Sequence, residues 1–224
     1  MCTWLDPRFP RHRRLWLQVA PSVPTDDLSH DADHLVRVYR WALRLAPDAE
    51  VDPDLAGAAA LVHDLAAIPK DDARRALAGA QSAASALEPL HRSGYSEGEV
   101  AAVAEAVRTS PWSAGLTPTG PLGRLLQDAD RLDAIGAIGI ARSLCCAQGM
   151  ASRGRPLTLY HPTDLLARGR DPDEAHHAVD HFHVKLLRLA AGMHLEPARR
   201  EAAQRQQRMQ RFLEELALEV ETMG

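Results

Sequence analysis

The feature that most constrains the fold is the spacing of the apolar residues, which recur every three or four positions along nearly the whole chain. This spacing places them on one face of an α-helix, whereas a half-buried strand needs strict alternation. Alanine, leucine, arginine and glutamate dominate, and runs of β-branched residues are missing. The sequence therefore predicts an all-helical protein, and its 224 residues suffice for one globular domain.

Capping residues, prolines and glycines divide the first half of the chain into expected helices. Asp27 and Ser29 are the candidate caps of the second helix, and Ser96 with Glu99 forms a capping box for the fifth. One short helix is expected within residues 10–23. The other expected helices cover about residues 30–46, 52–68, 71–92 and 96–109.

The second half begins with a loop rich in proline, glycine and serine. It continues as a long helix, an irregular segment, a further helix and a final helix rich in arginine and glutamate. These segments are expected over residues 110–121, 122–148, 149–172, 173–192 and from 196 onward. We expect an N-terminal segment (1–26) with a short helix, a domain over 27–195, and a C-terminal helix (196–224) packed on that domain or extending it.

Charge and cysteine content exclude several classes of protein. The formal net charge is −4 with acids and bases interspersed, so no basic stripe predicts binding to nucleic acid. No apolar run is long enough to span a bilayer, and the N-terminus does not resemble a signal peptide. The three cysteines form no metal-binding or disulfide pattern. We therefore expect a cytoplasmic protein with no membrane partner.

Four residues with metal-binding side chains fall on three different expected helices. They are His34, the adjacent pair His63 and Asp64, and Asp130. Two imidazoles and two carboxylates suit a divalent ion such as Mn, Fe, Co or Ni, with Mg as a further candidate. A single His-Asp pair arises often by chance, and the acidic run at Asp130 could be a solvated helix face. The apolar or small-residue runs beside both motifs favour buried positions instead.

Such a set leaves coordination positions open for water and for a phosphate oxygen. A bound ion can lower the pKa of that water and hold the phosphate, which is the core of hydrolysis at phosphorus. Neighbouring carboxylates can orient or deprotonate the water. The four residues therefore indicate a phosphorus-centred reaction without indicating which bond breaks.

The order H…HD…D, with HDADHLVRV, AALVHDL, SAGL, QDADRLDAIGAIGIAR, GRPLTLY and DHFHVKLL, resembles the HD-domain phosphohydrolase superfamily. The closest likeness is to stand-alone bacterial proteins that include nucleoside triphosphate pyrophosphohydrolases, and it covers roughly residues 27–220. The resemblance implies a single HD-domain helical bundle. It also implies that His34, His63, Asp64 and Asp130 hold one divalent ion, with Mn²⁺ favoured, and that the last three take part in catalysis.

The chain departs from the family pattern at two places. It reads RTSPWSAG where relatives tend to have a histidine before the SAG-like loop, and Ala66-Ala67 where relatives often have Gly-Asp. These departures favour one ion over two.

The resemblance also implies residues that contact the substrate. Arg131 resembles a phosphate-binding residue, Lys70 follows the HD pair, and His181 with Lys185 matches the family's HFxxKLL segment. Lys70 and Lys185 are the only lysines in the chain, and surface salt bridges are the alternative role for both. His30 precedes His34 by one helical turn, so it could support a ligand, contact substrate or cap the helix.

The expected function is release of pyrophosphate from nucleoside triphosphates. Two alternatives stay open: a nucleotidase that cleaves phosphomonoesters, and a non-catalytic HD module that senses a nucleotide. The expected partner is a phosphorylated small molecule, and the final helix is compatible with a homodimer.

Overall fold

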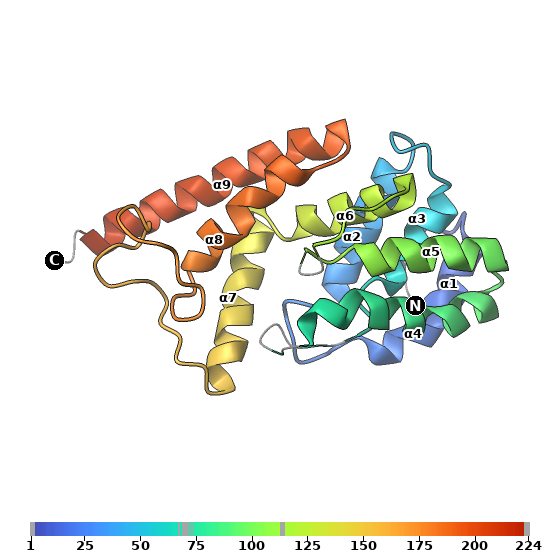
Figure 1. Ribbon diagram of the computed structural model, residues 1–224. Helices are drawn as coiled ribbons and strands as arrows, with labels where there is room; N and C mark the ends of the chain where they lie inside the picture. The colour runs from blue at the N-terminus through green and yellow to red at the C-terminus, as the bar shows by residue number, and fades with distance from the viewer. Residues whose placement is uncertain (1–2, 67, 69–71, 73, 113–114, 222–224) are drawn as a thin grey trace. The chain divides into compact units, whose positions relative to one another are not determined.

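The computed structural model describes residues 3–66, 68, 72, 74–112 and 115–221, and within these ranges every regular element is helical. Among the described residues, one bridge between extended residues joins Thr158 and His177. The predicted all-α class is therefore confirmed (Figure 1). The chain forms two compact units, the first made of Met1–Asp26 with His30–Asp130 and the second of Asp27–Ser29 with Arg131–Gly224. The division at residues 27 and 196 expected from the sequence stays a prediction.

The first unit contains most of the helices. They are α1 (Pro10–Val19), the 3-10 turn η1 (Ala20–Ser22), α2 (Ala32–Leu45), α3 (Pro53–Val62), the 3-10 turn η2 (Arg75–Leu77), α4 (Ala78–Ser93), α5 (Glu97–Thr109) and α6 (Pro121–Asp133), whose last three residues enter the second unit. The second unit adds α7 (Gly136–Ser152), α8 (Asp180–Val184), the 3-10 segment η4 (Leu186–Gly192) and α9 (Glu196–Glu221).

Helix α3 is the centre of the first unit, where α1, α2 and α5 pack around it. All seven residues from Ala56 to Val62 are buried, and five of them are alanine or glycine. Small side chains let the surrounding helices approach α3 closely on all sides. The His-Asp pair thus follows the most enclosed helix of this unit.

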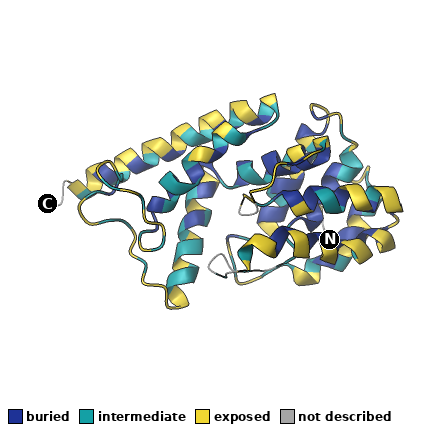
Figure 2. Cartoon of the chain, viewed as in Figure 1, coloured by how far each residue is buried: buried dark blue, intermediate teal, exposed yellow. Residues whose placement is uncertain are grey.

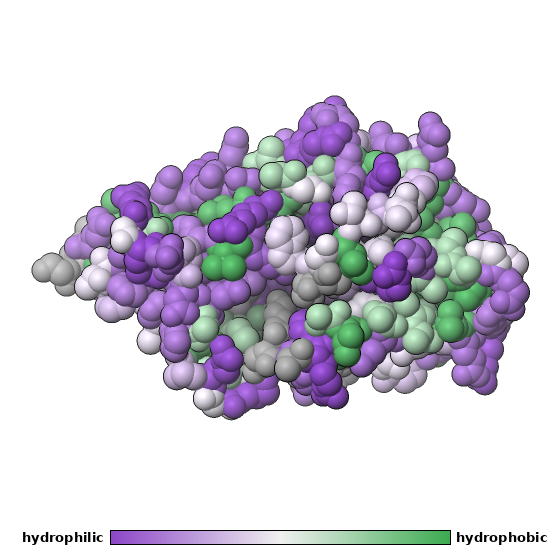
Figure 3. Space-filling view, in the orientation of Figure 1, coloured by the Kyte–Doolittle hydropathy of each residue, from purple (hydrophilic) through white to green (hydrophobic). Residues whose placement is uncertain are grey.

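The second unit is built on the packing of α9 against α7 and η4. Buried residues recur along one side of α9, at Ala198, Ala202, Met209, Leu213 and Ala217, and most of the rest of the helix is exposed or half-buried (Figure 2). The side chains that α9 and its neighbouring loop present in Figure 3 are mainly hydrophilic. The predicted amphipathic C-terminal helix is confirmed.

Several expected helix boundaries were wrong, each for a local reason. Asp31 rather than Asp27 or Ser29 caps α2, because its extended backbone brings its carboxylate within 3.0 Å of the His34 N–H. Helix α3 ends at Val62 instead of continuing to residue 68. The fourth helix starts at Ala78, because Asp72 accepts the Arg74 N–H in a turn.

The expected helix over 122–148 is two helices, α6 and α7, with a break at residues 134–135. Gly136 has a φ of +77° at the break, a conformation that glycine adopts without strain. The helix expected over 173–192 starts only at Asp180, and it is divided into α8 and η4 at Lys185. Among the described helices, none is individually long and apolar enough to cross a bilayer, although the bent pair of α6 and α7 meets that test on length and composition.

Candidate metal centre

Three of the predicted ligands come from three helices of the first unit. His34 lies in the first turn of α2, where the Asp31 cap holds its backbone. His63 is the residue at which α3 ends, and Asp130 lies in the last turn of α6. Both histidines are almost fully buried, with exposed fractions of 1% and 5%, whereas the Asp130 side chain is 30% exposed. The cluster therefore opens toward solvent on its carboxylate side.

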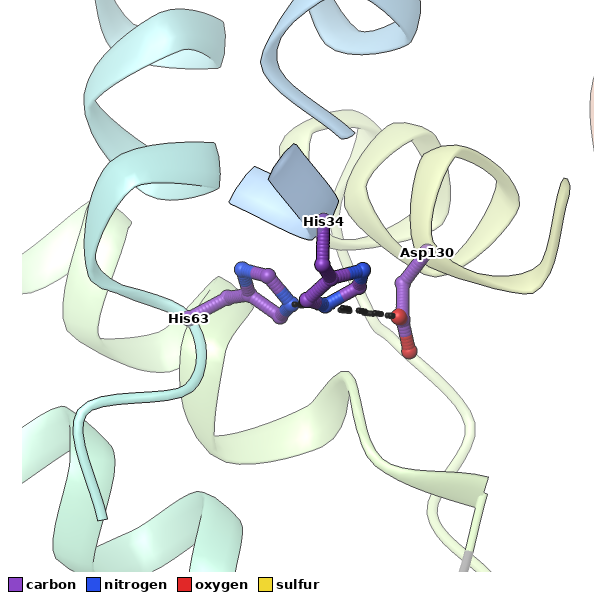
Figure 4. Close-up of side chains that lie close together, drawn as sticks. All are labelled: His34, His63 and Asp130. Atoms are coloured by element: carbon purple, nitrogen blue, oxygen red, sulfur yellow. Dashed lines mark hydrogen bonds and ion pairs between the residues drawn. The ribbon is translucent and has the colours of Figure 1, made fainter. Parts of the chain in front are cut away.

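The donor atoms of these three residues converge on one point (Figure 4). The Nε2 atoms of His34 and His63 are 3.2 Å apart, and each is 3.8 Å from Oδ1 of Asp130. Two ligands that each lie about 2.1 Å from one ion are separated by roughly 3.0–3.4 Å in tetrahedral or octahedral geometry. The imidazole pair already has this spacing, and a small shift of the carboxylate would complete it. The donor set and its spacing therefore fit a divalent ion.

The ring of His63 is held in the orientation that a ligand needs. Its Nδ1 donates a hydrogen bond to the carbonyl oxygen of Ala60 at 2.9 Å, so Nε2 is the nitrogen that faces His34. Metal-binding histidines commonly use a backbone carbonyl in this way to fix the tautomer and the ring plane. The C-terminal end of α3 thus supplies both the predicted ligand, at the C-cap, and its support.

Charges around the cluster favour a cation at its centre. Burial alone would lower the pKa of His63, but the carboxylates of Asp130 and Asp64 outweigh burial and raise that pKa above its ordinary value. Burial alone would raise the pKa of Asp64, but the imidazoles of His63, His30 and His34 outweigh it and lower that pKa. The site therefore combines ionised carboxylates with imidazoles that attract positive charge.

The structure also places three further residues close to the cluster. The ring of His30 lies edge-on to that of His34, with the ring centres 6.2 Å apart, and His30 acts electrostatically on Asp64. Asp64 follows His63 directly but is not in the group whose donor atoms lie within 4.8 Å of one another. Arg75, which we did not predict, helps to lower the pKa of Asp64 and donates a hydrogen bond to the Ile68 carbonyl oxygen at 2.7 Å. Its only signal in the sequence was a basic residue soon after the HD pair.

Of the remaining residues predicted to contact the substrate, three do not lie in the first unit with the cluster. Arg131 donates from Nη1 to the Gly192 carbonyl oxygen at 2.6 Å. His181 pairs with Glu174 at 2.6 Å, and the Lys185 N–H donates to the His181 carbonyl oxygen, although α8 ends one residue earlier. These three belong to the second unit, and Lys70 lies outside the described residues. Their contact with substrate stays a prediction.

Neighbouring acids that could have activated water are engaged in other contacts. The carboxylate of Asp133 is 1% exposed and pairs with Arg142 at 2.8 Å. Asp72 pairs with Arg74 at 2.8 Å, and Asp71 lies outside the described residues. Asp128, two residues before the predicted ligand Asp130, is fully buried, so this acidic run is not the solvated helix face that remained an alternative.

Comparison with known proteins identifies the family. The sequence profile of the HD domain matches residues 31–135, which span all four predicted ligands. The chain is 32% identical over 212 residues to the uncharacterized protein YpgQ of Bacillus subtilis strain 168, an alignment that covers 92% of this chain and 91% of YpgQ. The chain belongs to the HD-domain superfamily. It is a metal-dependent HD-family phosphohydrolase.

Several solved structures share the fold over nearly the whole chain. A protein from Lactobacillus plantarum has a TM-score of 0.74 at 28% identity, covering 96% of this chain and 98% of its own. B. subtilis YpgQ in complex with ADP has a TM-score of 0.67 at 27% identity, covering 93% and 97%. An HD-superfamily hydrolase from Bacillus thuringiensis has a TM-score of 0.61 at 26% identity, covering 92% and 97%.

Proposed function

We propose that this HD-domain protein hydrolyses nucleotides, releasing pyrophosphate from nucleoside or deoxynucleoside triphosphates. The observation that carries the proposal is the convergence of His34, His63 and Asp130 from three helices onto one point. The ADP bound to YpgQ supports a nucleotide as the class of substrate. The family resemblance favours pyrophosphate as the product.

We propose His34, His63, Asp64 and Asp130 as the ligands of one divalent ion, with Mn²⁺ favoured over Mg²⁺, Co²⁺, Ni²⁺ and Fe²⁺. A bound ion of this kind acidifies water and polarises a phosphate oxygen. The donor set supports the assignment, since mixed imidazole and carboxylate ligands suit these metals. Asp64 is included because it directly follows His63 and its carboxylate interacts electrostatically with the imidazoles of His63, His30 and His34.

Other contacts of the chain orient the ligands, admit water and bind the substrate phosphates. The bond from His63 Nδ1 to the Ala60 carbonyl keeps Nε2 directed into the site, so no side-chain reorganisation is needed there. The partly exposed side of Asp130 faces the solvent from which water and substrate arrive. We assign phosphate binding to Lys70, Arg131, His181 and Lys185, and support of the ligands or contact with the substrate to His30.

Arg75 joins these residues as a further candidate for phosphate binding. Its guanidinium is close enough to lower the pKa of Asp64, and Arg75 as a whole is half-buried at the start of η2. A second copy of the chain is compatible with α9, and we expect neither a nucleic acid nor a membrane as partner. The reducing environment indicated by the cysteines is consistent with a cytoplasmic reaction.

The first test measures the products from nucleoside mono-, di- and triphosphates with Mn²⁺, Co²⁺, Ni²⁺ or Mg²⁺, using ³¹P NMR to separate pyrophosphate from phosphate. We expect pyrophosphate from triphosphates only when metal is present. Replacing a metal ligand commonly costs several orders of magnitude in rate, so Asp130→Ala should reduce turnover at least 10³-fold. Asp48→Ala removes an exposed carboxylate elsewhere and should leave the rate unchanged.

The other outcomes separate the alternatives. Phosphate released from monophosphates would assign the chain as a nucleotidase. Metal binding without turnover of any nucleotide would favour the sensor. Turnover that is equal in the Asp130→Ala and Asp48→Ala variants would contradict the proposed site.

A further inference from the structure

Arg142 on α7 joins two segments of the second unit that are far apart in the sequence. Its Nη1 donates to the carboxylate of Asp133 at 2.8 Å, and its Nε donates to the carbonyl oxygen of Ser29 at 2.7 Å. A guanidinium can make both bonds at once because its donors point outward in a planar fork. A lysine ammonium carries its three donors on one nitrogen, so it lacks the two separated, coplanar donor nitrogens that Arg142 uses here.

The bridge is well enclosed. The side chain of Asp133 is 1% exposed and that of Arg142 is 13% exposed, while Ser29 as a whole is 1% exposed. Removing one partner of a buried ion pair leaves a charge without compensation, which is strongly unfavourable. The two contacts are therefore held in one geometry rather than exchanging with water.

Both tethered segments lead directly into proposed metal ligands. Asp133 is the last residue of α6 and follows Asp130 by three positions, which is less than one helical turn. Ser29 comes directly before His30 and five positions before His34. One guanidinium therefore fixes the end of the helix that carries the carboxylate ligand and the entry to the helix that carries a histidine ligand.

Further hydrogen bonds restrain the same two segments. The Ser29 N–H donates to Asp27 at 2.9 Å, and the Cys146 thiol donates to the Ser29 hydroxyl at 3.0 Å. At the end of α6, the Leu132 carbonyl oxygen accepts from Arg205 at 2.6 Å. Of these contacts, only those of Arg142 restrain both segments through one side chain.

We propose that Arg142 is a positioning residue for the metal site, acting through Asp133 and Ser29 to set the spacing of the Asp130 and His34 donors. This inference rests on the ligand set proposed above. Supporting residues of this kind typically change metal affinity 10- to 100-fold when they are replaced. Arg142 therefore controls affinity for the ion without contacting it.

The test measures the Kd for Co²⁺ by titration calorimetry, with thermal unfolding of the metal-free chain recorded in parallel. Arg142→Ala should weaken Co²⁺ binding about 10- to 100-fold. Arg142→Lys keeps a positive charge for Asp133, so it should recover most of the metal-free Tm but not the affinity. Arg108→Ala, which removes an exposed ion pair with Glu105 on α5, is the matched control and should bind Co²⁺ like the wild type.

A folded Arg142→Ala variant with a Kd within twofold of the wild type would overturn the inference. If that variant does not fold, Arg142→Lys decides in the same way: weaker binding supports the bridge, and wild-type affinity overturns it. If the wild-type chain binds Co²⁺, Asp130→Ala abolishes this binding and the Arg142 variants bind as tightly as the wild type, then this inference is overturned while the proposed ligand set stands. Absence of Co²⁺ binding by the wild-type chain would overturn the ligand set as well.

Discussion

At the scale of single residues, the candidate metal centre shows what spacing in the sequence can and cannot reveal. His34, His63 and Asp130 were predicted from residue type and context, and their donor atoms converge. The bond from His63 to the Ala60 carbonyl could not be predicted, because it depends on where α3 ends. Arg75 was missed for the same reason, since its approach to Asp64 depends on the path of the chain after the HD pair.

Packing at Gly57 gives a prediction that also belongs to one residue. A Cβ atom at this position would lie 2.3 Å from Cε1 of the buried His12 and 2.9 Å from Cε2 of Tyr39. His12 is held by Tyr39 at 2.8 Å and by the Asp54 carbonyl oxygen at 2.8 Å, so it cannot move away cheaply. Gly57→Ala should therefore lower the free energy of unfolding by about 1–3 kcal/mol, measured by urea denaturation.

The matched control is Gly98→Ala, because nothing lies within 4 Å of a Cβ atom added at that position in α5. This variant should be as stable as the wild type or more stable by up to about 1 kcal/mol, since alanine favours helix. Equal stability of the two variants would show that the contact between α1 and α3 is looser than described.

At the scale of elements, helices with clear end signals were predicted well. Ser96 and Glu99 form the expected capping box, and α5 ends at Thr109 as predicted. The break between α6 and α7 was missed, because Ala134 and Gly136 in a run of small residues are also compatible with one continuous helix. The division at Lys185 was missed because no proline or glycine marks it.

The N-terminus of α5 provides a prediction about acid stability. Arg11 and the backbone at Ser96 hold the pKa of Glu99 at about 2, below its usual 4.5. A lowered carboxylate pKa stabilises the fold fully above pH 4.5, and this stabilisation is lost as the pH falls toward 2. Glu99→Gln should therefore be less stable than the wild type by about 1 kcal/mol at pH 7, with the difference disappearing near pH 2.

Chemical denaturation at several pH values measures this difference. Glu88→Gln is the control, because Glu88 and Arg92 form an exposed pair that contributes little. A difference between Glu99→Gln and the wild type that does not change with pH would mean that the glutamate acts through packing instead of charge.

At the scale of the whole molecule, α6 is the element that belongs to both units. Its first ten residues lie in the first unit with the candidate metal centre, and its last three lie in the second. Sequence periodicity predicted the fold class, and the HD motif predicted the family. Neither could predict this division, because it depends on which distant segments pack together.

A bound ion should stabilise the folded chain as a whole. At a metal concentration 100 times Kd, binding adds about 2.7 kcal/mol to the free energy of unfolding, which raises Tm by roughly 5–11 °C for a chain of this size. The rise should disappear with a chelator and in His63→Ala. His91→Ala, at an exposed position on α4, should retain it. A rise of the same size in His63→Ala would place the ion elsewhere.

The enclosure of α3 has a consequence for how this protein can change over generations. Each alanine from Ala56 to Ala60 is buried against neighbours on every side, so nearly all codon changes there introduce a larger or a polar group. Lineages descended from this chain should accept few of these changes, whatever reaction they catalyse. A map of slowly evolving positions would therefore mark α3 as strongly as the His-Asp pair that follows it, and in α3 the slow rate would reflect crowding instead of chemistry.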